Sequence, residues 1–372
     1  MDNIQDTNRT NALFERIAAL IEQSRHYVVS AVNVAEVRTR FEVGRFIFED
    51  EQQGERATYG KQILKNLSVR LTKSFGNDWS YDTLIRCRKF YQAYENAVIV
   101  ATTLPQLGKE NLPNKEVENW GNDVATIRLP RFTLSWSHYL ILMRIENVEA
   151  RSFYEIEATQ QQWSVKQLSR QVGSSLYERL ALSRNKDEVM RLACEGQAIE
   201  KPSDIIKNPV TLEFLGLKPE VAYTESKLEN AIIDKMQQFL LELGKGFLFE
   251  ARQKRFTFDE RNFYVDLVFY NRLLQCYVLI DLKTGDLTHQ DLGQMQMYVN
   301  YYDRHVKQDF EKPTIGILLC KEKSDALVEL TLPKDTNIYA SQYSLYLPDK
   351  ALLKSKLKEW YDEFNEIKGI DE

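Results

Sequence analysis

The fold of the chain is decided by residues 263–283, FYVDLVFYNRLLQCYVLIDLK. Two apolar runs rich in aromatic and β-branched residues flank a short polar turn, which predicts two strands joined as an antiparallel hairpin. Side chains alternate along a strand, so Asp281 and Lys283 lie on one face and Leu282 on the other. Asp266 is the one charged residue of the first run. The hairpin therefore predicts that Asp266 and Asp281 come together on neighbouring strands.

Two carboxylates held close together in an apolar setting point to a bound cation. Burying like charges is unfavourable unless a counter-charge lies between them. Mg²⁺ takes hard oxygen ligands, commonly one or two carboxylates with water and substrate phosphate, and Mn²⁺ is an alternative ion. Asp266 and Asp281 are the expected ligands, with the backbone carbonyl of Leu282 as a third. Lys283 could then hold the attacking water or help to deprotonate it.

The acid-x-lysine triplet is weak evidence by itself, because the chain contains it at 225–227, 281–283 and 366–368. Only the second copy ends an apolar strand and follows a strand with an isolated aspartate. The first copy opens a predicted helix, and the third lies in a polar tail. Another interpretation of 281–283 remains open, in which an Asp–Lys pair at a strand end is satisfied by its neighbours.

Two further polar side chains lie four residues apart in the predicted helix 288–306. Gln294 and Tyr298 share a helix face, from which they could bind a metal-bound water or a phosphate oxygen. The alternative is an amphipathic helix whose polar pair faces solvent. Upstream, Glu229 in the predicted helix 225–243 could supply another carboxylate to the metal.

A capping role competes for Glu229, because Ser226 and Glu229 match the S-x-x-E capping box. In that motif the glutamate side chain bonds back to the backbone at the start of the helix. The two roles are compatible, and we expect Glu229 to take part in catalysis.

The chain of 372 residues divides by character into two parts. Residues 1–195 are predicted to form successive helices, interrupted by a proline-containing connection at 101–131. Residues 205–372 add two strand-like runs to the hairpin and bracket all four strands with helices. The predicted fold is therefore α + α/β, an all-helical domain followed by a mixed β-sheet flanked by helices. The additional elements are the strands 247–258 and 314–320 and the helices 225–243, 288–306 and 349–366.

The helical part contains a helix pair with the proportions of a helix-turn-helix. Predicted helices 59–74 and 80–95 are separated by a break at Gly76 and Asn77. Basic side chains on the pair could neutralise phosphates, although the solvated face of a helical bundle would look the same. DNA binding and protein binding are therefore both open for this part. The candidate nucleic-acid contacts are Lys61, Lys65, Arg86, Arg88 and Lys89.

The composition indicates a globular protein without secretion or membrane signals. Apolar residues make up 43% of the chain and the net charge is −5, so no overall basic signature marks nucleic-acid binding. No run approaches the ~20 apolar residues needed to cross a bilayer, and the polar start MDNIQDTNRT lacks a signal-peptide core. The four dispersed cysteines match neither a zinc site nor a disulfide scaffold. We expect a cytoplasmic location and no membrane partner.

The acidic, lysine and glutamine–tyrosine residues singled out above occur in an order that resembles the PD-(D/E)xK nuclease superfamily, including the Q-x3-Y helix of its RecB-like members. Segments 263–285 and 291–303 are similar to the bacterial YhcG-like nucleases. Two departures stand out, since Val265 replaces the proline before Asp266 and Asp281 stands where relatives often have Glu. Helical segments that also resemble these nucleases are 59–71, 75–94, 134–145 and 163–180.

The resemblance implies a restriction-endonuclease-like mixed sheet and Mg²⁺-dependent cleavage of phosphodiester bonds. The expected function is a DNA endonuclease whose N-terminal domain recognises DNA or a partner protein. A catalytically silent nucleic-acid or protein-binding module on the same fold is the main alternative, and a structural assembly protein is a third. A nuclease with one site per chain often pairs to cut both strands, so a homodimer is also expected.

Overall fold

The computed structural model describes residues 2–53, 57–103, 132–182, 184, 186–218, 221–323, 325–333 and 336–357. The chain forms two compact units, Met1–Asn147 and Val148–Glu372, and each is considered by itself. The predicted connection 101–131 falls mostly outside the described residues, as does the second half of the predicted helix 349–366. Among the described helices, none is long and apolar enough to cross a membrane.

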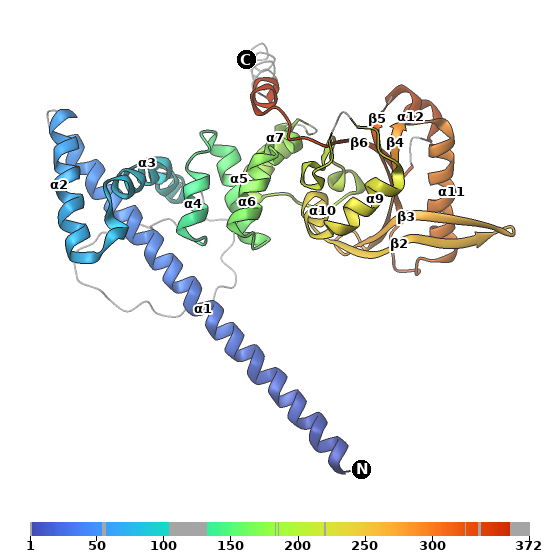
Figure 1. The fold of residues 1–372 in the computed structure, drawn as a ribbon, viewed down its shortest axis with the longest axis horizontal. Coiled ribbons are helices and arrows are strands. Elements are labelled where there is room, and N and C mark those ends of the chain that lie inside the picture. Colours follow the sequence, from blue (N-terminus) through green and yellow to red (C-terminus); the bar gives the residue numbers. More distant parts are fainter. Residues whose placement is uncertain are drawn as a thin grey trace. The chain divides into compact units, whose positions relative to one another are not determined.

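All regular elements in the described part of the N-terminal unit are helices, as predicted. The second half of α1 packs along α3, with Phe41 buried against Phe90 at a ring distance of 5.8 Å. Gly44 allows the two helices to approach, because a Cβ there would lie 2.1 Å from the Cys87 carbonyl oxygen. The helices are α1 (Asp2–Gln53), α2 (Ala57–Phe75), α3 (Tyr81–Thr103) and α4 (Trp136–Leu142) (Figure 1).

The predicted helix pair is present as α2 and α3, joined by a short 3-10 turn at Asn77–Trp79. Gly76 ends α2 with a φ of +97°, a conformation that favours glycine. The Ser80 hydroxyl accepts a 3.3 Å hydrogen bond from the Thr83 backbone N–H and so caps α3. The break predicted at Gly76 and Asn77 is confirmed.

The C-terminal unit begins with four helices and continues into a sheet flanked by further helices. The first helices are α5 (Val148–Gln160), α6 (Val165–Gly173), α7 (Leu176–Ala181) and α8 (Lys186–Glu195). The flanking helices are α9 (Glu225–Asp234), α10 (Met236–Leu243), α11 (His289–His305) and α12 (Asp325–Thr331). The strands are β1 (Val210–Thr211), β2 (Phe247–Phe258), β3 (Arg261–Asn271), β4 (Cys276–Asp286), β5 (Ile315–Glu322) and β6 (Ile338–Ser344).

The six strands form one mixed sheet in the order β1-β6-β5-β4-β3-β2. The pairs β4–β5, β5–β6 and β6–β1 are parallel, whereas the pairs β2–β3 and β3–β4 are antiparallel. The predicted mixed sheet and the hairpin at 263–283 are confirmed. Strands β1 and β6 were not predicted. The predicted helix 225–243 is wrong as one element, because it breaks at Lys235 into α9 and α10.

Alternation along β4 explains why the sheet is covered on both sides. Val278 and Ile280 belong to the apolar core that includes residues of α9 and α10. Leu279 points to the opposite side, into the core that includes residues of α11. Both faces of β4 are therefore apolar until the strand reaches Asp281, the charged residue that the sequence places near its end.

A buried ion cluster joins the first helices of this unit to the sheet region. The Glu242 carboxylate on α10 is fully buried and accepts hydrogen bonds from Arg179 at 2.7 Å and from Arg170 at 2.8 Å. Helices α6 and α7 thereby belong to the same compact unit as the sheet. The compact units divide between Asn147 and Val148, whereas the domains predicted from the sequence were 1–195 and 205–372.

Candidate active site

The acidic pair and the lysine meet where β3 and β4 run side by side. The register pairs Leu267 with Ile280, which brings Asp266 beside Asp281. The Leu282 backbone N–H donates a 2.8 Å hydrogen bond to Oδ2 of Asp266. This bond fixes the Asp266 carboxylate against β4. The sequence prediction that the two aspartates come together agrees with this geometry.

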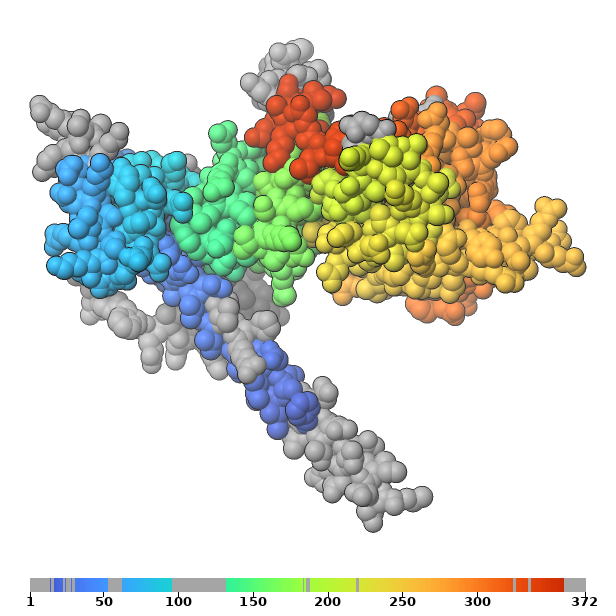
Figure 2. Space-filling model, in the orientation of Figure 1, coloured from blue at the N-terminus to red at the C-terminus, as the bar shows by residue number. Residues whose placement is uncertain are grey.

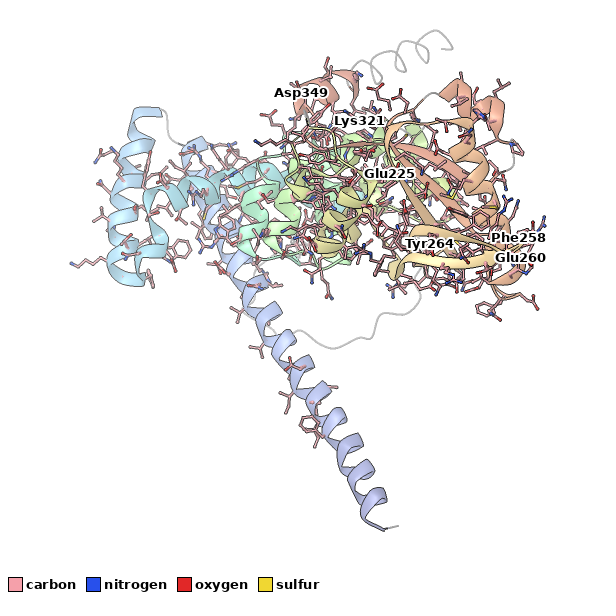
Figure 3. All side chains as sticks on the ribbon, turned by 45° about the vertical axis from the view of Figure 1, so that its right-hand side comes forward. Glu225, Phe258, Glu260, Tyr264, Lys321 and Asp349 are labelled. Atoms are coloured by element: carbon pink, nitrogen blue, oxygen red, sulfur yellow. The ribbon has the colours of Figure 1, made fainter. Side chains whose placement is uncertain are left out.

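Lys283 points at the acidic pair and is partly buried. Its Nζ lies 2.8 Å from Oδ2 of Asp281 and 3.7 Å from Oδ1 of Asp291, at the start of α11. A third carboxylate, Glu225 at the start of α9, is 4.0 Å away. Figure 3 labels Glu225. The lysine thus lies between the N-terminal ends of two helices and the acidic end of β4.

The electrostatics of the pair reflect burial and crowding of like charge. Asp281 is 3% exposed, and its burial together with the nearby Asp266 carboxylate raises its pKa to about 7. Burial acts to lower the pKa of Lys283, but the Asp281 carboxylate outweighs it and the pKa is raised. The site therefore holds a protonated Lys283 beside Asp281, whose carboxyl group loses its proton at a higher pH than an ordinary aspartate does.

Glu229 joins the site through a residue that the sequence did not single out. The Gln253 side-chain Nε2 donates to Oε2 of Glu229 at 2.6 Å and to Oδ1 of Asp266 at 2.9 Å. Gln253 has a φ of +46° within the edge strand β2, an uncommon conformation for a residue other than glycine. Arg252, the preceding residue, lies 3.0 Å from Oε1 of Glu229. One amide thus links two carboxylates from different elements.

The capping-box interpretation of Glu229 is wrong. Helix α9 is capped by Thr224, whose side chain accepts a hydrogen bond from the Lys227 backbone N–H. Ser226 lies inside the helix, two residues after the N-cap position. Glu229 is 4% exposed and its contacts run to β2 rather than to the start of its own helix.

Gln294 and Tyr298 share a face of α11, and the Gln294 amide donates to the Tyr298 hydroxyl. Tyr298 is buried, so the solvent-facing alternative is wrong for this residue. Burial raises the pKa of Tyr298, and the charges of Asp281 and Asp266 raise it further. The hydroxyl therefore lies within electrostatic reach of the acidic pair.

The carboxylate oxygens of the site suit a hard divalent cation, although they do not form a complete coordination shell. Within the described ranges, no three His, Cys, Asp or Glu side chains stand close enough to hold an ion by themselves. Mg²⁺ commonly uses only one or two carboxylates and completes its shell with water and substrate oxygens. Oδ2 of Asp281 and Oε1 of Glu229 are buried, and each lies within 3.0 Å of a cationic side chain. A divalent ion at these oxygens would compete with the Lys283 and Arg252 cations for them.

The basic residues predicted to contact nucleic acid lie on α2 and α3 of the other unit. Arg88 donates to both carboxylate oxygens of Glu51, at 2.7 and 2.9 Å, so its charge is already paired. Lys65, Arg86 and Lys89 are exposed. The Lys61 side chain lies outside the described residues. Nucleic-acid binding by these residues stays a prediction.

Comparison with known proteins agrees with this geometry. The family "YhcG PDDEXK nuclease domain" matches residues 203–358, and "DUF1016 N-terminal domain" matches 16–179. The protein "Putative nuclease YhcG" of Escherichia coli (strain K12) is 37% identical over 353 residues, which cover 93% of this chain and 92% of that protein. The chain belongs to the YhcG family of PD-(D/E)xK nucleases. The resemblance seen in the sequence is thereby confirmed.

A solved repair endonuclease from Pyrococcus abyssi is also similar, at 16% identity and a TM-score of 0.23. The match covers 36% of this chain and half of that chain. A likeness this weak adds nothing to the assignment. Membership of the YhcG family rests on the sequence relative and the two family matches. The restriction-endonuclease-like fold class rests on the mixed sheet and its flanking helices.

Proposed function

We propose that this YhcG-family protein is a metal-dependent DNA endonuclease that hydrolyses phosphodiester bonds with Mg²⁺ or Mn²⁺. The observation that carries the proposal is the meeting of Asp266, Asp281 and Lys283 at the end of β4, with a 2.8 Å contact between the lysine and Asp281. An acidic pair, a lysine and membership of a nuclease family together favour phosphodiester cleavage over other hydrolytic chemistry.

The residues that would hold the ion are Asp266, Asp281, Glu229 and the backbone carbonyl of Leu282. A divalent cation, when bound, neutralises charge on the phosphate and lowers the pKa of water. Asp266 is preset for this role, because the Leu282 N–H and the Gln253 amide fix both of its oxygens. Asp281 must give up a proton that its burial favours, so binding of the ion and deprotonation are coupled.

Lys283 supplies a fixed positive charge at the reacting phosphate. Its pKa is raised by the Asp281 carboxylate despite burial, so the ammonium keeps its protons at neutral pH. A cation held in a partly buried site stabilises the charge that develops on phosphate oxygens in the transition state. Of the two roles open to this lysine, positioning the water and stabilising charge is therefore favoured over removing a proton.

Three further side chains, Gln253, Gln294 and Tyr298, orient the groups around Asp266, Asp281 and Lys283. Gln253 links Glu229 to Asp266 and so ties α9 to the β2–β3 pair. Gln294 orients the Tyr298 hydroxyl, which can donate to a phosphate oxygen or to the attacking water. The N-terminal unit would recognise DNA or a partner protein, and its exposed Arg86 and Lys89 suit phosphate contacts.

The competing function is a binding module that has lost catalysis. A binding module without catalysis would be expected to have Lys283 turned away from the aspartates. The 2.8 Å contact between Lys283 and Asp281 is evidence against this function. The test is incubation of the full chain with supercoiled, linear, single-stranded and branched DNA, and with RNA, in Mg²⁺, Mn²⁺ or EDTA. We expect cleavage of at least one DNA form with either ion and none in EDTA. Binding without cleavage in every condition would replace the nuclease by the binding module.

A further inference from the structure

The β2–β3 hairpin extends past the rest of the sheet (Figures 1 and 2). One of its faces packs against α11. Phe256 stacks on Tyr301 of α11 at 4.1 Å and on Phe263 across the hairpin at 5.4 Å. Val265 continues this face and is completely buried. Aromatic packing therefore holds the hairpin rigidly against α11 and leaves its other face free.

The free face carries an arginine and a tyrosine in direct register. Arg255 pairs with Tyr264 across the two strands, and both side chains are exposed, Tyr264 by 47%. Phe263 and Val265 belong to the apolar core that includes residues of α11, so Tyr264 between them points away from that helix. Tyr264 thus lies two residues from Asp266, about 7 Å along the strand.

The charges around this pair fit a polyanion that crosses the hairpin. Within the described part of the chain Arg255 forms no ion pair, so its guanidinium is available to a ligand. The hairpin tip carries Asp259 and Glu260, the second labelled in Figure 3, followed by the exposed Arg261, so its net charge is negative. A strand would therefore lie across Arg255 and Tyr264, between the acidic tip and the catalytic aspartates.

We propose that Arg255 and Tyr264 form a binding site for the nucleic-acid strand that enters the active site. Arg255 pairs with a phosphate and Tyr264 stacks on a base next to the scissile phosphate. Stacking on an aromatic side chain needs an unpaired base, so the site prefers single-stranded or frayed substrate. The proposal rests on the proposed nuclease function, whose substrate it specifies.

The test compares affinities for a fluorescent single-stranded oligonucleotide in EDTA, where no cleavage is expected. We expect Tyr264→Ala to weaken binding about 5- to 100-fold and Tyr264→Phe to restore most of it. Arg255→Ala should lower the slope of log affinity against log salt by about one unit, and Arg255→Lys should restore it. Lys254→Ala and Phe258→Ala are matched controls on the α11 face of the same strand, and both should bind like wild type.

The outcomes separate the two proposals. Equal affinity of wild type, Tyr264→Ala and Arg255→Ala, with metal-dependent cleavage intact, would overturn the strand site and leave the nuclease standing. Equal weakening by the two controls would also overturn it, since the effect would then be one of general charge or folding. A wild type that neither binds nor cleaves any nucleic acid would remove both proposals.

A second inference rests on α1 and is independent of catalysis. The first part of this helix extends beyond the helices of its own unit (Figure 1). Phe14, Ile21 and Val28 recur every seven residues along it and are each exposed, by 65, 47 and 59%. Ile17, three residues after Phe14, is also exposed. Residues spaced by seven and by three form the apolar seam of a coiled coil.

We infer that this seam binds the same helix of a second copy of the chain. An identical heptad on two helices is self-complementary, as a twofold dimer requires, and helix α1 is long enough for several heptads. Leu20 and Val32 flank the seam and widen it. Pairing of the two helices would remove these large apolar side chains from water, which favours the dimer.

Sedimentation equilibrium of the full chain at micromolar concentration tests the seam. Wild type should be a dimer and Ile21→Arg a monomer with unchanged thermal unfolding. Ala19→Arg, on the opposite side of the same turn and exposed, should remain a dimer. A monomeric wild type, or a dimer that survives Ile21→Arg, would overturn the inference.

Discussion

Gln253 Nε2 lies 2.9 Å from Oδ1 of Asp266, and this hydrogen bond joins the edge strand to the acidic pair. The same nitrogen reaches Glu229 at 2.6 Å. Two carboxylates from α9 and β3 are therefore oriented by one amide, which itself has no charge. An uncharged donor can fix the carboxylates without neutralising them, and so leaves their charge for an ion.

Replacing Gln253 should weaken the site without removing a ligand. Side chains that orient metal ligands typically contribute 10- to 100-fold in metal affinity or activity. We expect Gln253→Ala to raise the Mg²⁺ concentration for half-maximal cleavage by about 10-fold or more. Gln238→Ala, at an exposed position on α10, is the matched control. An unchanged Mg²⁺ dependence would show that Gln253 does not orient the ligands.

Tyr298→Phe isolates the hydroxyl of the buried tyrosine. The ring packs edge-on to Phe256 at 5.6 Å, and phenylalanine keeps that packing. A hydrogen bond to a charged group is worth about 1.5–3 kcal/mol, so cleavage should slow by about 10- to 100-fold. Thermal unfolding measured alongside should change little. A large loss of stability with unchanged cleavage would make Tyr298 a core residue only.

Asp281 should destabilise the metal-free protein at neutral pH. Its pKa of about 7 exceeds the unfolded value of about 3.9. The stability that the neutral carboxyl contributes to the folded protein is therefore fully present below pH ~4. This stability is lost as the pH rises through 7. In EDTA, Asp281→Asn should be more stable than wild type above pH 7, by at most about 4 kcal/mol.

Thermal unfolding between pH 4 and 8 measures this difference. The gain of Asp281→Asn over wild type should grow with pH across that window. Asp286→Asn, which removes an exposed carboxylate at the end of the same strand, should show no such trend. A gain that is constant with pH would mean that Asp281 does not titrate there.

Glu242 should stabilise the C-terminal unit. Burial would raise its pKa, but Arg179, Lys207 and Arg170 hold it down to about 2. Glu242→Gln leaves these cations buried without a counter-charge and should destabilise the unit by about 3–5 kcal/mol. Because the pKa is depressed, the difference from wild type should be full above pH ~4.3 and shrink as the pH falls towards 2.

A matched control is Glu195→Gln, which removes one partner of an exposed ion pair with Arg191. Its effect should stay within about 1 kcal/mol. Denaturant unfolding monitored by circular dichroism compares the variants. Equal effects of the two substitutions would contradict a structural role for the buried cluster.

Strand β4 and its charged residues could be predicted because their signals are local. Asp266 and Asp281 each interrupt an apolar run, and alternation places Lys283 beside Asp281 within the same strand. Burial of both faces of the strand made the charges conspicuous. The order of these residues with Gln294 and Tyr298 then indicated the family, which the 37% identical relative confirms.

Other features depend on contacts that the sequence does not display. Gln253 lies in a polar run, EARQKR, and only the pairing of β2 with β3 brings it to Asp266. In the sequence, Glu242 looks like part of an ordinary amphipathic helix, yet its partner Arg179 is 63 residues away. Strand β6, IYASQYS, has too few apolar residues to predict a strand and forms by pairing with β5.

Whether Asp281 and Lys283 form a nuclease site is decided by measuring DNA cleavage by Asp281→Ala and Lys283→Ala beside wild type, in Mg²⁺ and in EDTA. Lys321→Ala, an exposed lysine near the end of the neighbouring strand β5, is the control. We predict that wild type and Lys321→Ala cleave in Mg²⁺ and that each site variant loses at least about 100-fold. Cleavage by either variant at the wild-type rate would contradict a nuclease site at Asp281 and Lys283.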